Sequence, residues 1–312
     1  MGFSFTQFAD ALRGGAEISA KDVLAARQWA WNDGGVSVAE AESLLALNRL
    51  AKTGSRDWNE FVVEALCEFV VNTQPPRGYI DDANAAWLES HIDQGGKVET
   101  RAEFELLVKV LETALNAPQS LKDYALHQVE LIVTTGIGPT RDGTVRPGVI
   151  DAGEVALLRR LLFASGSESG MTVSREEAEM LWRLKDACKN GDNAPGWKTL
   201  FVQAVGNHLM AHNFYRPLER TEALRLETFA NDSQSDIAGF LSRIARNIGH
   251  APLGVLAAKR EHEERYADLT ASAKVTTQDT DWIKSHVGAD GAADSFEQAL
   301  LAFISEETGS AI

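Results

Sequence analysis

The 312-residue sequence has only two cysteines, Cys67 and Cys188, and neither belongs to a CxxC pair. A disulfide framework or a zinc knuckle needs more cysteines at closer spacing, so we expect both residues to be small buried hydrophobes in a reducing compartment. The chain also lacks a run of about 18 apolar residues, and its first residues show no basic and apolar signal-peptide pattern. We therefore expect a cytoplasmic protein without membrane insertion.

Basic residues are scarce relative to acidic ones, since 30 Lys and Arg stand against 45 Asp and Glu and give a net charge of -15. This surplus repels the phosphate backbone, so it predicts no nucleic-acid binding and suits a basic protein partner or divalent cations. The GxxxxGK[ST] and GxGxxG phosphate loops and the GxSxG nucleophile motif are missing too. Without these common enzyme signatures, a non-enzymatic protein is favoured.

What the sequence has in abundance is helical periodicity. Val155, Leu158 and Leu162 lie at i, i+3 and i+7, and similar apolar stripes recur along the chain. Because such stripes need neighbours to cover them, the pattern predicts an all-α fold of tandem three-helix modules, packed as a multi-lobed helical array. The expected modules are residues 1–74, 75–137 and 138–212, followed by a helical insertion at 213–277 and a divergent C-terminal partial module at 278–312.

A helix-start signature recurs at the second helix of each module. It is the S/T-x-x-E capping box, in which a hydroxyl and a carboxylate satisfy free backbone N–H groups of the first turn. The pairs are Ser37 with Glu40, Thr100 with Glu103, Ser174 with Glu177 and, near the C-terminus, Ser295 with Gln298. In this last copy Asp294 stands where an apolar residue precedes the other caps. Extended structure should be limited to short bridges at the apolar residue of each turn, namely Ile18, Val36, Ile80, Val98, Ile150 and Val173.

One of these turns resembles a known calcium-binding loop. In NDGGVSVAE, residues 32–40, the second half of an EF-hand loop is matched at Asp33, Gly34, Val36, Ser37 and Glu40. These are the places of a ligand, the turn glycine, the bridging apolar residue, a second ligand and the closing ligand. GVIDAGEVALLRRLL, residues 148–162, is similar to the half repeat of dockerins, which are EF-hand relatives. The resemblance implies that the modules carry EF-hand-like turns and that calcium is the ion to consider as a cofactor.

The resemblance directs attention to three groups of oxygen-bearing side chains close to helix starts. With water completing a shell of about six to eight oxygens, each group would be a calcium site. The same side chains also work as plain helix caps, which is the alternative that the sequence favours. The three groups are Asp33, Ser37 and Glu40; Asp93, Glu99 and Glu103; and Glu168, Ser174 and Glu177.

A histidine pair offers a different chemistry. His208 and His212 stand at i and i+4, as in the HExxH motif of zinc enzymes, but Leu209 occupies the place of the glutamate base and no third ligand is evident. When Trp197 is aligned with Trp58 of the first module, His208 falls at the place of Phe69, which predicts a packed histidine rather than a ligand.

Three functions follow from these patterns. The leading hypothesis is a protein-interaction or scaffold module that binds another protein. The alternatives are a calcium-binding regulatory protein and a metal-dependent hydrolase built on the histidine pair. The sequence predicts neither the identity of the partner nor the oligomeric state.

Overall fold

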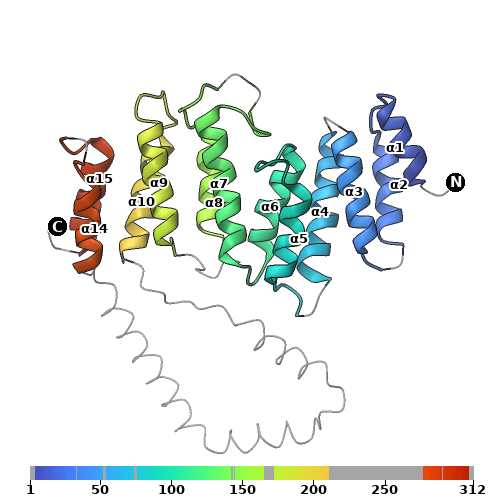
Figure 1. The fold of residues 1–312 in the computed structure, drawn as a ribbon, viewed down its shortest axis with the longest axis horizontal. Helices are drawn as coiled ribbons and strands as arrows, with labels where there is room; N and C mark the ends of the chain where they lie inside the picture. Colours follow the sequence, from blue (N-terminus) through green and yellow to red (C-terminus); the bar gives the residue numbers. More distant parts are fainter. Residues whose placement is uncertain are drawn as a thin grey trace, which may run out of the picture. The chain divides into compact units, whose positions relative to one another are not determined.

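The computed structural model describes residues 4–32, 34–51, 54–73, 76–141, 143, 145–164, 172–210, 277–289 and 291–308. Within these ranges the chain forms twelve helices and no strand, which confirms the all-α fold (Figure 1). The described residues contain two isolated bridges, Tyr79 with Asn116 and Asp93 with Val98. Val98 is one of the expected bridge positions, and Tyr79 directly precedes another. None of the described helices is both long and apolar enough to cross a membrane.

The chain divides into two compact units, Met1–Phe201 and Val202–Ile312. The finer division into modules ending at residues 74, 137 and 212 stays a prediction. Of the expected insertion at 213–277, all but the final residue lies outside the described residues. The helices before the unit boundary are α1 (Phe5–Arg13), α2 (Ala20–Ala30), α3 (Val38–Leu50), α4 (Arg56–Asn72), α5 (Asp82–Ile92), α6 (Arg101–Thr113), α7 (Gln119–Thr135), α8 (Ala152–Leu162) and α9 (Arg175–Ala187), and α10 (Gly196–Met210) runs across it.

Helix lengths recur in the first unit. Helices α2, α3 and α4 have 11, 13 and 17 residues, and α5, α6 and α7 have the same three lengths in the same order. Helices α8 and α9 again have 11 and 13 residues. Helices of equal length can be compared position by position, counting from the first residue of each helix.

The expected capping boxes begin α3, α6 and α9, with both reciprocal hydrogen bonds present. The box expected at Ser295 and Gln298 is wrong by one residue. The Asp294 carboxylate accepts hydrogen bonds from the backbone N–H groups of Phe296, at 2.8 Å, and Glu297, at 3.0 Å, so Asp294 is the cap of α15 (Ser295–Thr308). A carboxylate is favoured there because it also interacts with the positive end of the helix dipole.

The core of the first unit surrounds α4, which packs against α2, α3 and α6. Trp58, Phe61 and Leu66 of this helix are completely buried, and the Trp58 and Phe61 rings meet edge to face with centroids 5.6 Å apart. Each large apolar side chain removed from water in this way contributes about 1.5–3 kcal/mol. Cys67 and Cys188 are buried free thiols, as expected.

The second unit contains α14 (Thr277–His286) and α15. In α14 the Ser285 hydroxyl donates to the carbonyl of Trp282, at 2.6 Å, as the Ser90 hydroxyl of α5 does to the carbonyl of Trp87, at 2.9 Å. The histidine after each serine also contacts the same carbonyl. The sequence DWIKSHV at residues 281–287 is similar to AWLESHI at residues 86–92, and the two segments share these side-chain hydrogen bonds.

Candidate functional site

The first of the three calcium candidates is a helix cap. The Glu40 carboxylate accepts from the Ser37 backbone N–H at 2.9 Å and from the Ser37 hydroxyl at 2.8 Å. Asp33 lies outside the described residues. The structure therefore brings Ser37 and Glu40 together at the start of α3, with one oxygen of Glu40 already accepting two hydrogen bonds.

The residues of the second calcium candidate interact with different partners rather than with one another. Glu103, which is buried, accepts from the Thr100 backbone N–H at 3.2 Å and forms an ion pair with Arg49 at 3.1 Å. Asp93 instead accepts from the Tyr124 hydroxyl, at 3.0 Å. Burial, followed by this hydrogen bond, raises the pKa of Tyr124 above its ordinary value. The remaining member, Glu99, is exposed.

The third candidate contains a buried ion pair. Lys122 of α7 has no exposed side-chain surface, and its Nζ lies 2.9 Å from the Glu177 carboxylate, which is 1% exposed. Glu177 also accepts from the side chain of Gln119, at 2.9 Å, and from the backbone N–H of Ser174, at 3.1 Å. The remaining member of this group, Glu168, lies outside the described residues.

Most described members of these groups thus act as caps or ion-pair partners in the fold, whereas Asp93 accepts a hydrogen bond from Tyr124 and Glu99 is exposed. Among the described residues, no three or more His, Cys, Asp and Glu side chains are grouped so that they could hold a metal ion. Calcium binding stays a prediction. Of the histidine pair, His208 packs edge-on against Trp282 with ring centroids 5.2 Å apart, and His212 lies outside the described residues.

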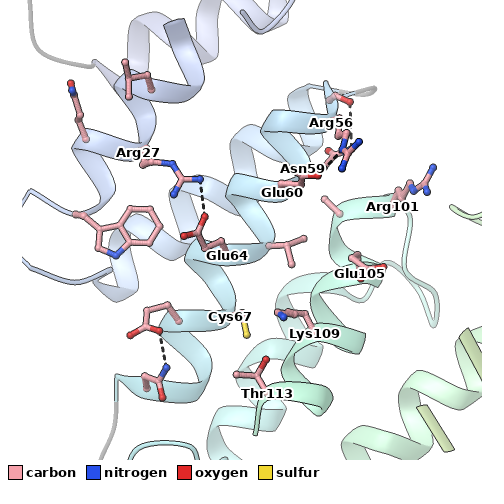
Figure 2. Close-up of a pocket in the computed structure, with 18 residues that line it drawn as sticks. Arg27, Arg56, Asn59, Glu60, Glu64, Cys67, Arg101, Glu105, Lys109 and Thr113 are labelled. Atoms are coloured by element: carbon pink, nitrogen blue, oxygen red, sulfur yellow. Dashed lines mark hydrogen bonds and ion pairs between the residues drawn. The ribbon is translucent and has the colours of Figure 1, made fainter. Parts of the chain in front are cut away.

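A groove of about 1400 Å³ lies in the first unit, and the sequence patterns above do not identify it. Each of three helices contributes one face to it, because the lining residues of each helix recur at helical spacing. Figure 2 shows α4 between the other two helices. The lining is Leu24, Arg27 and Gln28 from α2, with Trp31 after it; Arg56, Asn59, Glu60, Val63, Glu64, Cys67, Glu68 and Asn72 from α4, with Gly54 before it; and Arg101, Ala102, Glu105, Lys109 and Thr113 from α6.

Most charges of this α2–α4–α6 groove are paired within the protein. Arg27 reaches from α2 to Glu64 of α4 at 2.7 Å, and its guanidinium lies 5.6 Å from the centroid of the Trp31 ring (Figure 2). Along α4, Arg56 pairs with Glu60 at 2.7 Å. On α6, Glu105 pairs with Arg160 of α8 at 2.8 Å.

Two groove cations on α6, Arg101 and Lys109, differ from these. Both are exposed, and in the described part of the chain neither lies within ion-pair distance of a carboxylate. Figure 2 shows Cys67 of α4 pointing toward Lys109 and Thr113. Burial raises the pKa of the Cys67 thiol, while a hydrogen bond with Thr113 and the positive charge of Lys109 offset part of that rise.

The same place in the α7–α9 pair is occupied differently. Lys109 is the ninth residue of α6 and corresponds to Arg183, the ninth of α9, and Cys67 is the twelfth residue of α4 and corresponds to Glu130, the twelfth of α7. Arg183 and Glu130 form two hydrogen bonds, at 2.8 and 3.0 Å. A thiol in place of the glutamate leaves Lys109 without the carboxylate that its counterpart has.

A second hollow, of about 900 Å³, lies between the turns that precede α8 and α10. Asn193 fills a structural role in it, because its side-chain oxygen accepts from the Ile150 backbone N–H at 2.9 Å and its amide donates to the Cys188 carbonyl at 2.7 Å. This hollow is therefore part of a hydrogen-bonded turn pair.

The α2–α4–α6 groove is the candidate functional site on geometry alone. The sequence gives one indication of it: apolar Val63 and Cys67 alternate with glutamates along the face of α4 that lines the groove. Comparisons of the chain with protein-family models, with curated proteins and with solved structures gave no match. The inference of function therefore rests on the groove and its charges.

Proposed function

We propose that this chain is a protein-interaction module whose α2–α4–α6 groove binds a helical segment of a partner protein. The observation that carries the proposal is the groove itself, a long open depression lined by one face of each of three packed helices. Recognition of an amphipathic helix in a groove between helices is a recurrent mode of protein binding.

The dimensions of the groove favour a helix over a small molecule. Its volume of about 1400 Å³ exceeds the ~300–1,000 Å³ of ordinary small-molecule sites. It follows α4, whose 17 residues span about 25 Å at 1.5 Å per residue. Four to five turns of a partner helix fit along that length.

The lining also has the composition of a protein-binding surface. Leu24 of α2 and Trp31, the residue after α2, provide apolar area above the buried Val63 of α4, and the lining also contains charged side chains. Leu24 is 56% exposed and leaves apolar surface inside the groove for a partner to cover. Arg27, held by its ion pair with Glu64, gives this surface a fixed shape before binding.

The recurrence of helix lengths supports a second part of the proposal, that α2–α4, α5–α7 and α8–α10 are three tandem copies of one module. In such arrays, functional differences arise where one copy departs from the others at a shared position. We propose that the α4–α6 pair is the part of the array that differs in this way.

A matched pair of substitutions tests the proposal. Leu24, inside the groove, and Leu115, outside it, are 56% and 58% exposed. A phage-displayed library of helical peptides is panned on the full chain, and the enriched peptides are then measured against Leu24→Arg and Leu115→Arg by fluorescence anisotropy. We expect affinity to fall at least about tenfold with Leu24→Arg and to stay unchanged with Leu115→Arg. Enriched peptides that bind both variants equally, or a library without enrichment, contradict the proposal.

A further inference from the structure

We infer that the segment bound in the α2–α4–α6 groove is an acidic amphipathic helix, whose two carboxylates, two helical turns apart, pair with Arg101 and Lys109. This inference rests on the proposed function and adds the chemistry of the partner. Both cations line the groove and have no ion-pair partner in the described part of the chain.

The spacing of the two cations matches a helical partner. Arg101 and Lys109 are eight residues apart on α6, so their backbone positions are separated by about 12 Å along one side of the helix. On a partner helix running along the groove, carboxylates at i and i+7 or i+8 share one face and are separated by a similar distance. One partner helix can therefore meet both cations at once.

The other groove charges do not compete for these carboxylates. Arg27 and Arg56 are already paired with glutamates of α4. Among the groove glutamates, Glu68 accepts from the Asn72 side chain at 2.7 Å, and Glu105 pairs outside the groove with Arg160. Inside the protein, Arg101 and Lys109 of α6 have no carboxylate within ion-pair distance in the described part of the chain, and Glu68 of α4 has a hydrogen bond but no cation there.

The corresponding helix pair shows which group belongs beside Lys109. Arg183 of α9 is satisfied by Glu130 of α7, with nitrogen–oxygen distances of 2.8 and 3.0 Å. At the α4–α6 pair, Cys67 stands in place of that glutamate, and Lys109 faces the groove beside it. A carboxylate from the partner supplies the group that α4 lacks.

The net charge of -15 argues for a basic partner instead, so the two expectations can be separated. At physiological ionic strength, charges farther apart than about 8 Å are largely screened, whereas ion pairs in contact, partly desolvated by the bound peptide, are screened less. We therefore expect the local cations to decide the choice of peptide, and the overall charge to lower only the rate of encounter.

The test uses the helical library of the previous section and the full chain. We expect enriched peptides to carry Asp or Glu pairs seven or eight residues apart, with apolar residues between them. Their affinity should fall at least about tenfold with Lys109→Glu and remain unchanged with Lys97→Glu, an exposed control that changes the net charge equally. Replacing the peptide carboxylate by lysine should restore binding to Lys109→Glu.

The outcomes separate this inference from the function on which it rests. Enriched peptides that are sensitive to Leu24→Arg but are basic or neutral, or are indifferent to Lys109→Glu, overturn the inference and leave the groove as a binding site. The absence of any peptide sensitive to Leu24→Arg overturns both. Self-association of the parent chain that Leu24→Arg abolishes, measured by analytical ultracentrifugation, identifies a second copy as the occupant and also overturns the inference.

Discussion

The α4–α6 and α7–α9 helix pairs are built from helices of the same lengths, 17 and 13 residues, and differ in how their charges are satisfied. In the α7–α9 pair, Lys122 is buried against Glu177. In the α4–α6 pair, the fourth position of the longer helix is Asn59, where α7 has Lys122. The counterpart of Glu177 is Glu103, which forms its ion pair with Arg49 of α3.

If the groove binds a helix as we propose, a few residues distinguish the α4–α6 pair from the α7–α9 pair. Two positions of α4, Asn59 and Cys67, carry neutral side chains where α7 carries Lys122 and Glu130. The first change removes a cation that would cross to α6, and the second leaves Lys109 facing the groove. Substitutions at these positions and at the helix caps separate the two contributions.

Removing the buried cation should have the largest effect. Lys122→Met leaves the Glu177 carboxylate buried and without its counter-ion, which costs about 3–5 kcal/mol of unfolding free energy. Asn59→Ala, at the corresponding place in α4, should cost less than about 1 kcal/mol, because Asn59 makes one long hydrogen bond, 3.4 Å, to the Gly54 carbonyl.

Urea unfolding followed by circular dichroism measures both changes. The double variant Lys122→Met with Glu177→Gln should recover part of the loss, since no charge is then left buried. A loss below about 1 kcal/mol for Lys122→Met alone would show that the ion pair does not hold α7 against α9.

Supplying the missing carboxylate should close the groove to acidic peptides. Cys67→Glu places a glutamate where α7 has Glu130, so Lys109 gains an internal partner and the affinity for an acidic helical peptide should fall about tenfold, or about 1.4 kcal/mol. Cys67→Gln introduces a side chain of the same size as glutamate but without its charge and serves as the control, with affinity unchanged. Equal affinities of Cys67→Glu and the parent would contradict the role assigned to Lys109.

The caps should behave alike in the two helix pairs, because they depend on local chemistry. Ser174→Ala at α9 should cost about 1 kcal/mol of unfolding free energy. Thr100→Ala at α6 should cost at least as much, since the Thr100 hydroxyl also accepts from the Asn48 side chain at 2.9 Å. Thermal unfolding monitored by circular dichroism gives both values, and an unchanged midpoint for Ser174→Ala would show that its cap adds no stability.

The smallest effect is expected at Glu40, which caps α3 without a buried ion pair. Glu40→Gln should change the unfolding free energy by less than about 0.5 kcal/mol, because the amide oxygen can still accept the Ser37 hydrogen bond. Added calcium should leave the melting temperature of parent and variant unchanged. A calcium-dependent rise in the parent that Glu40→Gln removes would favour the calcium regulator over the interaction module.

The helix starts were predictable from the sequence, and the groove was not. Capping depends on side chains three residues apart, which is why the boxes at Ser37, Thr100 and Ser174 are correct. Near the C-terminus, two overlapping patterns compete, one starting at Asp294 and one at Ser295, and the carboxylate at Asp294 provides the stronger acceptor.

The site depends instead on contacts between distant segments. Residues 24–31, 56–72 and 101–113 line one groove only because α4 packs between α2 and α6, and no local pattern encodes that arrangement. Lys122 could not be assigned to the core for the same reason. A lysine is buried only with a partner, and Glu177 is 55 positions further along the chain.

Photo-crosslinking of a bound peptide tests the central claim most directly. An enriched helical peptide carrying benzophenone on its apolar face is irradiated with the full chain, and the attachment sites are read by mass spectrometry. The account predicts crosslinks within residues 24–31, 56–72 and 101–113, and their loss with Leu24→Arg. Crosslinks concentrated on α7 and α9, or unaffected by Leu24→Arg, would contradict it.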